Sequence, residues 1–72
     1  MEQEKYKGCL LWGHAIAQQE ELLEPERYAA SGTITRDQKF VEASGVLGFF
    51  YTEQEAQEAG LAWARAWVDA HL

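Results

Sequence analysis

The sequence predicts a small α+β domain, in which a three-stranded antiparallel meander packs against one C-terminal helix (β-β-β-α). Three observations carry this prediction. Residues 6–17, 27–36 and 39–51 show the two-residue alternation of strands, polar residues separate the first two of them, and residues 53–70 carry apolar side chains at helical spacing. The chain has 72 residues, which we expect to form a single domain over residues 1–72.

The first strand is predicted over residues 6–17, after a polar and frayed start at residues 1–5. The bulkier side chains occupy even positions and are expected to form the core face: Tyr6, Leu10, Trp12, His14 and Ile16. The odd positions carry Cys9, Leu11, Ala15 and Ala17, so both faces of this strand are expected to be covered. Gly8 and Gly13 weaken the strand or mark a bulge.

The second strand is predicted over residues 27–36, after a polar connection at 18–26 that carries four glutamates and the only proline. An alternative for this connection is one helical turn that ends before Pro25. In the strand, one parity is expected to face the core and holds Tyr28, Ala30, Gly32 and Ile34; the other holds Ser31, Thr33 and Thr35. The two residues that follow, Asp37 and Gln38, lack glycine, so a tight primed hairpin is poorly encoded.

The third strand is predicted over residues 39–51. Its alternation breaks near Gly45 and again at Gly48, which indicates a bulge or a sharp bend. The alternative is a pair of short strands, 39–43 and 46–51.

The helix is predicted to run from Glu53 to about Ala70. Thr52 and Glu55 form a capping box, in which the threonine caps the helix and the glutamate reaches back to the cap N–H. One stripe is expected to pack on the sheet: Ala56, Ala59, Gly60, Trp63, Trp67 and Ala70. A second stripe on another side of the helix consists of Leu61, Val68 and Leu72.

The composition argues against nucleic acid and membrane partners. There are 12 acidic residues and 6 basic ones, the net charge is −6, and the basic residues are scattered rather than clustered. No apolar run approaches the roughly 18 residues of a membrane span. The acidic start, Met1-Glu-Gln-Glu, is unlike a signal peptide, and the single cysteine suits a reducing compartment, so we expect a cytoplasmic protein.

No catalytic, cofactor-binding or metal-binding residue is predicted, and the protein is not expected to be an enzyme. Two histidines and one cysteine are too few for a closed four-ligand zinc site. Cys9 and His14 lie five positions apart in a predicted strand, hence on opposite faces. Cys9 is interpreted as a small core residue and His14 as a structural one. The remaining alternative is a small-ligand binder or enzyme that uses Trp12, His14 and Cys9.

The leading functional hypothesis is a protein–protein interaction module that acts as a homodimer, with Leu61, Val68 and Leu72 as its contact residues. The sheet face that the single helix leaves open is the other surface expected to take part in self-association. A chain this short buries only about 60% of its unfolded surface, so self-association would supply stability that the core lacks. The alternative is an acidic inhibitor or antitoxin-like protein that binds a basic partner. Its contact residues would include the glutamates of the connection: Glu20, Glu21, Glu24 and Glu26.

The C-terminal stretch FFYTEQEAQEAGLAWARAWVDAHL resembles the tail of a family of short uncharacterised proteobacterial proteins. Those proteins carry an aromatic strand end, then T-x-E/Q-E-A, then a G-L-x-W-A-R-A-W helix, and Tyr6-Lys7-Gly8 is similar to their Y/W-x-G start. The resemblance implies a β-β-β-α unit and no known activity. A looser likeness to the HicB-type antitoxin domain rests on Tyr51-Thr52 and Glu55-Ala56. The chain departs from complete HicB proteins in having no DNA-binding segment after the helix.

Overall fold

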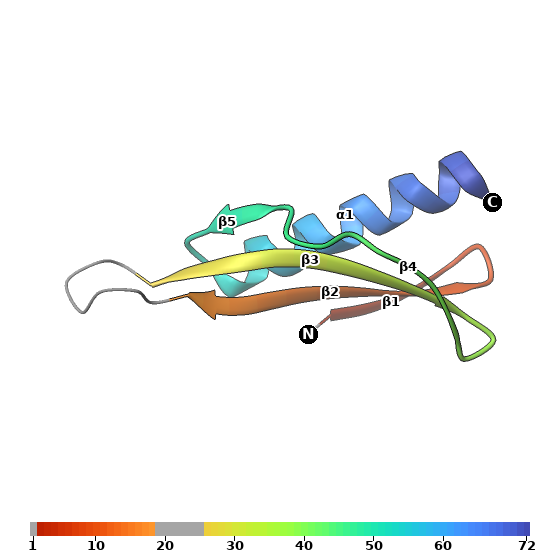
Figure 1. Cartoon of the computed structure of the whole chain (residues 1–72), viewed down its shortest axis with the longest axis horizontal. Coiled ribbons are helices and arrows are strands. Elements are labelled where there is room, and N and C mark those ends of the chain that lie inside the picture. Colours follow the sequence, from red (N-terminus) through yellow and green to blue (C-terminus); the bar gives the residue numbers. More distant parts are fainter. Residues whose placement is uncertain (1, 19–25) are drawn as a thin grey trace.

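The computed structural model describes residues 2–18 and 26–72, and in them an antiparallel sheet packs against one helix in two layers (Figure 1). The elements in chain order are β1 (Glu2–Tyr6), β2 (Cys9–Gln18), β3 (Arg27–Arg36), β4 (Lys39–Ala43), β5 (Gly48–Phe50) and α1 (Glu53–His71). The predicted α+β meander with a C-terminal helix is therefore confirmed. The acidic connection before β3 falls mostly outside the described residues, so both interpretations of it stay predictions.

The strands form an antiparallel meander in the order β1-β2-β3-β4, and β5 pairs with β3 as well. β4 pairs with residues 33–36 of β3, and β5 pairs with residues 28–30, so both lie along the same edge. The predicted third strand is thus two short strands, as the alternative had it. The second of them spans residues 48–50, and the register of β3 with β4 shifts between Ile34 and Thr35.

The polar N-terminus is a strand, not a frayed end. Residues 2–6 pair with residues 9–13 through a two-residue turn in which Lys7 and Gly8 have φ of 50° and 81°. Positive φ at both positions defines a primed hairpin turn, and a charged strand is tolerated at a sheet edge. Asp37 and Gln38 form a second turn of this kind, with φ of 52° and 66°, although neither is glycine. Gly8 therefore marks a turn rather than a weak point inside one long strand.

The prediction for the core face of the first strand is wrong. The buried side chains of β2 are Cys9 and Leu11 at odd positions, whereas Trp12 and His14 are only half-buried and Ile16 is exposed. The reason is that Gly13 lies on the same face of β2 as Cys9 and Leu11, and this is the face that contacts the helix. On β3 the expected parity is confirmed, because Ala30, Gly32 and Ile34 are all buried.

Three glycines set the distance between the two layers. Gly13 and Gly32 are register partners in the middle of the sheet, and Gly60 of α1 lies against them. A Cβ atom on Gly13 would overlap with the carbonyl oxygen of Gln57, and one on Gly60 would overlap with the carbonyl oxygen of Ser31. The helix backbone therefore touches the sheet backbone, which only residues without a side chain permit.

This close contact also decides which side of the helix is buried. The central cluster joins Cys9, Leu11 and Ile34 of the sheet to Leu61, Ala64 and Val68 of the helix. Trp63 and Trp67, which were predicted to pack directly on the sheet, are partly buried at the side of this cluster. An indole ring does not fit where two backbones touch, so the smaller Leu61 and Val68 take the central positions.

The start of the helix follows its local sequence. The Thr52 hydroxyl accepts a hydrogen bond from the backbone N–H of Glu55 at 3.1 Å and donates one to the Glu55 carboxylate at 2.8 Å. The predicted cap is confirmed at Thr52, although the glutamate meets the threonine hydroxyl rather than its backbone N–H. The helix ends at His71, one residue beyond the predicted end.

Candidate functional site

The face of the sheet opposite α1 is covered by no element in the described part of the chain (Figure 1). We call it the open face. The strand register places the following residues on it: Gln3, Lys5, Leu10, Trp12, His14, Ile16, Gln18, Arg27, Ala29, Ser31, Thr33, Thr35, Phe40, Ala43 and Phe49. Adjacent residues on one face of a sheet contact one another, so these side chains form rows across the strands.

Apolar side chains gather at both ends of the open face. At one end, Ile16 and Phe49 lie on either side of Ala29 in a row across β2, β3 and β5. Ile16 is 50% exposed and Phe49 is 56% exposed. At the other end, Leu10, Thr35 and Phe40 form a row in which Phe40 is largely exposed. Covering these side chains with a second surface lowers the free energy of the system, because apolar surface is removed from water.

Polar contacts hold the centre of the open face in place. The Trp12 indole N–H donates to the Thr35 hydroxyl at 3.4 Å, and His14 Nε2 lies 3.0 Å from the Thr33 hydroxyl. These bonds fix an aromatic and an imidazole ring against two threonines, so the centre of the face is preorganised. At its edge, the Arg27 guanidinium lies over the Phe49 ring, 5.7 Å from the ring centre.

The two faces of the molecule differ in charge. The strand residues on the open face include two cations, Lys5 and Arg27, and no carboxylate. On the helix side, the Arg65 guanidinium donates to the Glu4 carboxylate at 2.6 Å and to the Glu58 carboxylate at 2.7 Å. The hydrogen bond that Arg65 donates to Glu58 is the largest of the effects that raise the pKa of Arg65. One guanidinium there pairs with two carboxylates, so the cluster has a net negative charge.

A second polar cluster lies at the far end of the helix. The Asp69 carboxylate accepts hydrogen bonds from the Lys7 ammonium at 2.6 Å and from the Tyr6 hydroxyl at 2.8 Å. The Lys7 hydrogen bond, followed by that of Tyr6, lowers the pKa of Asp69. Reciprocally, the hydrogen bond to Asp69 raises the pKa values of Lys7 and Tyr6. Lys7 and Asp69 are exposed and Tyr6 is half-buried, so this cluster joins the first hairpin to the end of the helix at the protein surface.

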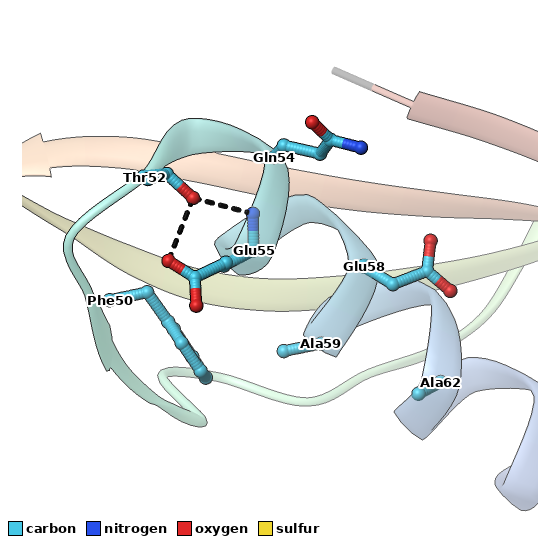
Figure 2. Close-up of a pocket in the computed structure, with 7 residues that line it drawn as sticks. All are labelled: Phe50, Thr52, Gln54, Glu55, Glu58, Ala59 and Ala62. Carbon is cyan, nitrogen blue, oxygen red and sulfur yellow. Dashed lines mark hydrogen bonds between the residues drawn. The ribbon is translucent and has the colours of Figure 1, made fainter.

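A groove of about 470 Å³ runs between β5 and the first half of α1 (Figure 2). Its apolar part consists of the Phe50 ring with Ala59 and Ala62 of the helix, and Glu55 and Glu58 are its two carboxylates. In Figure 2 the Phe50 ring points toward the side of the helix that carries Ala59, and the Glu55 carboxylate lies between this ring and Thr52. The remaining lining residues are Thr52 and Gln54.

The residues predicted for the homodimer contact do not form one exposed surface. Leu61 and Val68 are 4% and 0% exposed in the core, and only Leu72 is accessible, at 55%. The prediction that these residues form an exposed stripe is therefore wrong, because the glycine contact turns Leu61 and Val68 toward the sheet. The open face carries Leu10, Trp12, His14 and Ile16 of β2, which were predicted to face the core. The sequence did indicate an uncovered sheet face, because it predicts one helix, and one helix covers only one face of a sheet.

The structure separates the residues of the small-ligand alternative. Trp12 and His14 lie on the open face, whereas Cys9 is buried on the helix side with its thiol free. Cys9 is therefore the core residue that its sequence context predicted, and it cannot act with His14. Among residues 2–18 and 26–72, no three His, Cys, Asp or Glu side chains converge as metal ligands do. Within the same residues, α1 is not apolar enough to cross a membrane.

Comparison with known proteins identifies one family. The family model of a domain of unknown function, DUF6566, matches residues 6–72, which is most of the chain. No curated protein and no solved structure was found to match.

Proposed function

The chain belongs to the DUF6566 family, and we propose that it is a non-enzymatic protein–protein interaction module that forms a homodimer through its open face. The observation that carries the proposal is the uncovered apolar surface of the sheet, in which Ile16 and Phe49 are at least half exposed beside Trp12 and His14. Contiguous apolar patches on small proteins mark interaction sites. The buried, unpaired thiol of Cys9 suits a cytoplasmic location, which we propose with it.

The charge of the open face opposes a second copy less than the charge of the helix side does. A chain with net charge −6 repels its copies, and the repulsion is strongest where carboxylates meet. The strand residues of the open face carry no carboxylate, so two copies that meet there keep the acidic helix sides pointing outward. In a symmetric dimer, the same patch serves both copies, and Trp12 and His14 would lie near the middle of the contact.

The dimer is tested by placing charge on the apolar row of the open face. Ile16→Asp with Phe49→Asp introduces carboxylates where apolar side chains would be covered, and we expect the dissociation constant to rise at least about 100-fold. Both residues are at least half exposed within one chain, so the double variant should stay folded. Sedimentation velocity gives the association state, and circular dichroism checks the fold.

A matched control places the same charge on the helix side. Ala66 and Leu72 are both exposed there, and Ala66→Glu with Leu72→Glu adds two negative charges as well. The homodimer proposal predicts that this control dimerises as the unmodified protein does. Equal loss of the dimer in both double variants would mean that net charge, not the open face, governs association. Loss in the control alone would move the contact to the helix end near Leu72.

A further inference from the structure

We propose that His14 makes homodimer formation depend on pH, so that two copies associate when its imidazole is neutral and separate when it is protonated. This inference rests on the proposed homodimer, because it concerns the regulation of the same face. Two observations carry it. His14 lies between the apolar ends of the open face, and the strand residues described on that face hold no carboxylate that could balance a second positive charge nearby.

The position of His14 places its ring inside the dimer contact. On β2 it lies between Trp12 and Ile16, and its register partner on β3 is Ser31. A second copy that covers the two apolar ends of the open face also covers the ring between them. Histidine is the side chain whose ordinary pKa lies closest to neutral pH, so the contact covers a group that changes charge there.

Protonation of His14 is compatible with the fold of a single chain. The ring is half-buried, and its Nε2 lies 3.0 Å from the Thr33 hydroxyl. A hydroxyl can donate or accept a hydrogen bond, so Thr33 can hold the ring in either protonation state. In a single chain, water also reaches the ring and stabilises its charge. In the dimer that water is displaced, and an ion without a partner is strongly disfavoured away from water.

The charged groups on the open face oppose a further cation. β1 contributes Lys5 and β3 contributes Arg27, and both are positive. The residues that β4 and β5 place on this face are uncharged: Phe40, Ala43 and Phe49. Protonated His14 would therefore be a third positive group on each copy, and a symmetric contact brings these groups of the two copies toward one another.

The expected sign is opposite to that of the overall charge. Acidification makes a chain of net charge −6 less negative, which reduces the repulsion between copies and by itself strengthens association. Protonation of His14 weakens association instead. If the dimer accepts only neutral imidazole, and histidine titrates near its ordinary value of about 6.5, each copy contributes a factor of about ten at about pH 5.5. The dissociation constant should then rise about 100-fold between about pH 8 and about pH 5.5.

The proposal is tested by measuring the dissociation constant at these two pH values by sedimentation equilibrium at constant ionic strength. His14→Gln keeps a polar group that can reach Thr33 but does not titrate, so the constant should change less than about twofold. His71→Gln is the matched control, because this exposed ring, the other histidine of the chain, stacks on Trp67 at the end of the helix. The control should keep the response of about 100-fold, and an equal pH response in both variants would overturn the assignment to His14.

A second measurement needs no variant. The imidazole C–H signals of the unmodified protein are followed by NMR against pH, at a low and at a high protein concentration. If the dimer retains the neutral ring, the midpoint for His14 falls to lower pH as the concentration rises, and that for His71 stays constant. A midpoint for His14 that does not depend on concentration would overturn the proposal, even where His14→Gln itself fails to associate.

The outcomes separate this inference from the homodimer. A protein that dimerises with the same dissociation constant at both pH values contradicts only the role of His14. A protein that is monomeric at every concentration at about pH 8 contradicts the homodimer, and with it the regulation that rests on it. Tighter association at about pH 5.5 would show that the overall negative charge, and not His14, governs the response to pH.

Discussion

The two faces of the sheet are packed differently, although the same strands form them. On the helix side, Gly13 and Gly32 bring the backbones of helix and sheet into contact, and Leu11 and Ile34 are completely buried. On the open face, the neighbouring residues Trp12 and Thr33 are only half-buried, and no described element lies over them. The comparison teaches that the bulkier set of side chains on a strand need not be the set that its own chain buries. The smaller set permits closer packing, and the larger set remains available to a partner.

The largest effect is expected where the two layers touch. Gly60→Ala would normally stabilise a helix by up to about 1 kcal/mol. Here its Cβ would overlap with the carbonyl oxygen of Ser31, so we expect a loss of about 4 kcal/mol or more in the free energy of unfolding, measured by urea denaturation. Gly48→Ala is the matched control, because a Cβ there meets only the Phe50 ring at 3.8 Å. If both variants lost the same stability, the glycine contact would not set the layer distance.

The next effect separates the two faces directly. Leu11→Ala should lower the free energy of unfolding by about 3 kcal/mol, because Leu11 is fully buried against the helix. Ile16→Ala, on the open face of the same strand, should cost less than about 1 kcal/mol in dilute protein. At high concentration its cost should increase, since a dimer contact stabilises the folded state by mass action. A concentration-independent cost for Ile16→Ala would argue that the open face has no partner.

Local signals predicted more of this fold than signals that depend on distant contacts. The cap at Thr52 and the length of the helix follow from adjacent residues, and both are confirmed. The inner parity of β3 was also predictable, because Ala30 and Ile34 alternate with polar side chains. The face of β2 that packs on the helix could not be predicted, since both faces carry apolar residues. It is decided by the close contact between Gly13 and the backbone of Gln57. That same contact rotates Leu61 into the core.

The candidate sites were harder to predict than the fold. Placing the β2 residues of the open face depends on knowing which face of β2 the helix covers, so Leu10, Trp12, His14 and Ile16 were assigned to the core, whereas Thr33 and Thr35 of β3 were correctly expected to face away from it. The groove brings Phe50 together with Ala59 and Ala62, a contact that depends on how the helix lies against β5. The sequence showed Glu55 only as part of a helix cap, and its place beside Phe50 required the tertiary structure.

A smaller effect is expected at the start of the helix. Thr52→Ala removes the hydroxyl that caps the backbone N–H of Glu55, so the free energy of unfolding should fall by about 1 kcal/mol. Thr52→Ser keeps the hydroxyl and should retain most of the stability. Thermal denaturation of the two variants side by side gives this difference. A loss as large for serine as for alanine would show that the threonine methyl, and not the cap, is responsible.

The smallest effect concerns the exposed cluster at the end of the helix. Lys7 and Tyr6 lower the pKa of Asp69 in the folded state, so the cluster stabilises the protein above the ordinary carboxyl value of 3.8. That contribution is lost as the pH falls from there through the lowered pKa. Asp69→Asn should therefore weaken the acid-induced loss of stability below pH 3.8 and change little once the pH lies below the lowered pKa. An unchanged pH profile of unfolding would show that the cluster contributes nothing measurable.

The most direct test of the contrast between the two faces is the molar mass of the unmodified protein by light scattering across a dilution series. If a second copy covers the open face, the mass approaches twice the chain mass of 8.2 kDa at high concentration and falls toward 8.2 kDa on dilution. A mass of 8.2 kDa at every concentration would contradict the account. The open face would then belong to a different partner or to none.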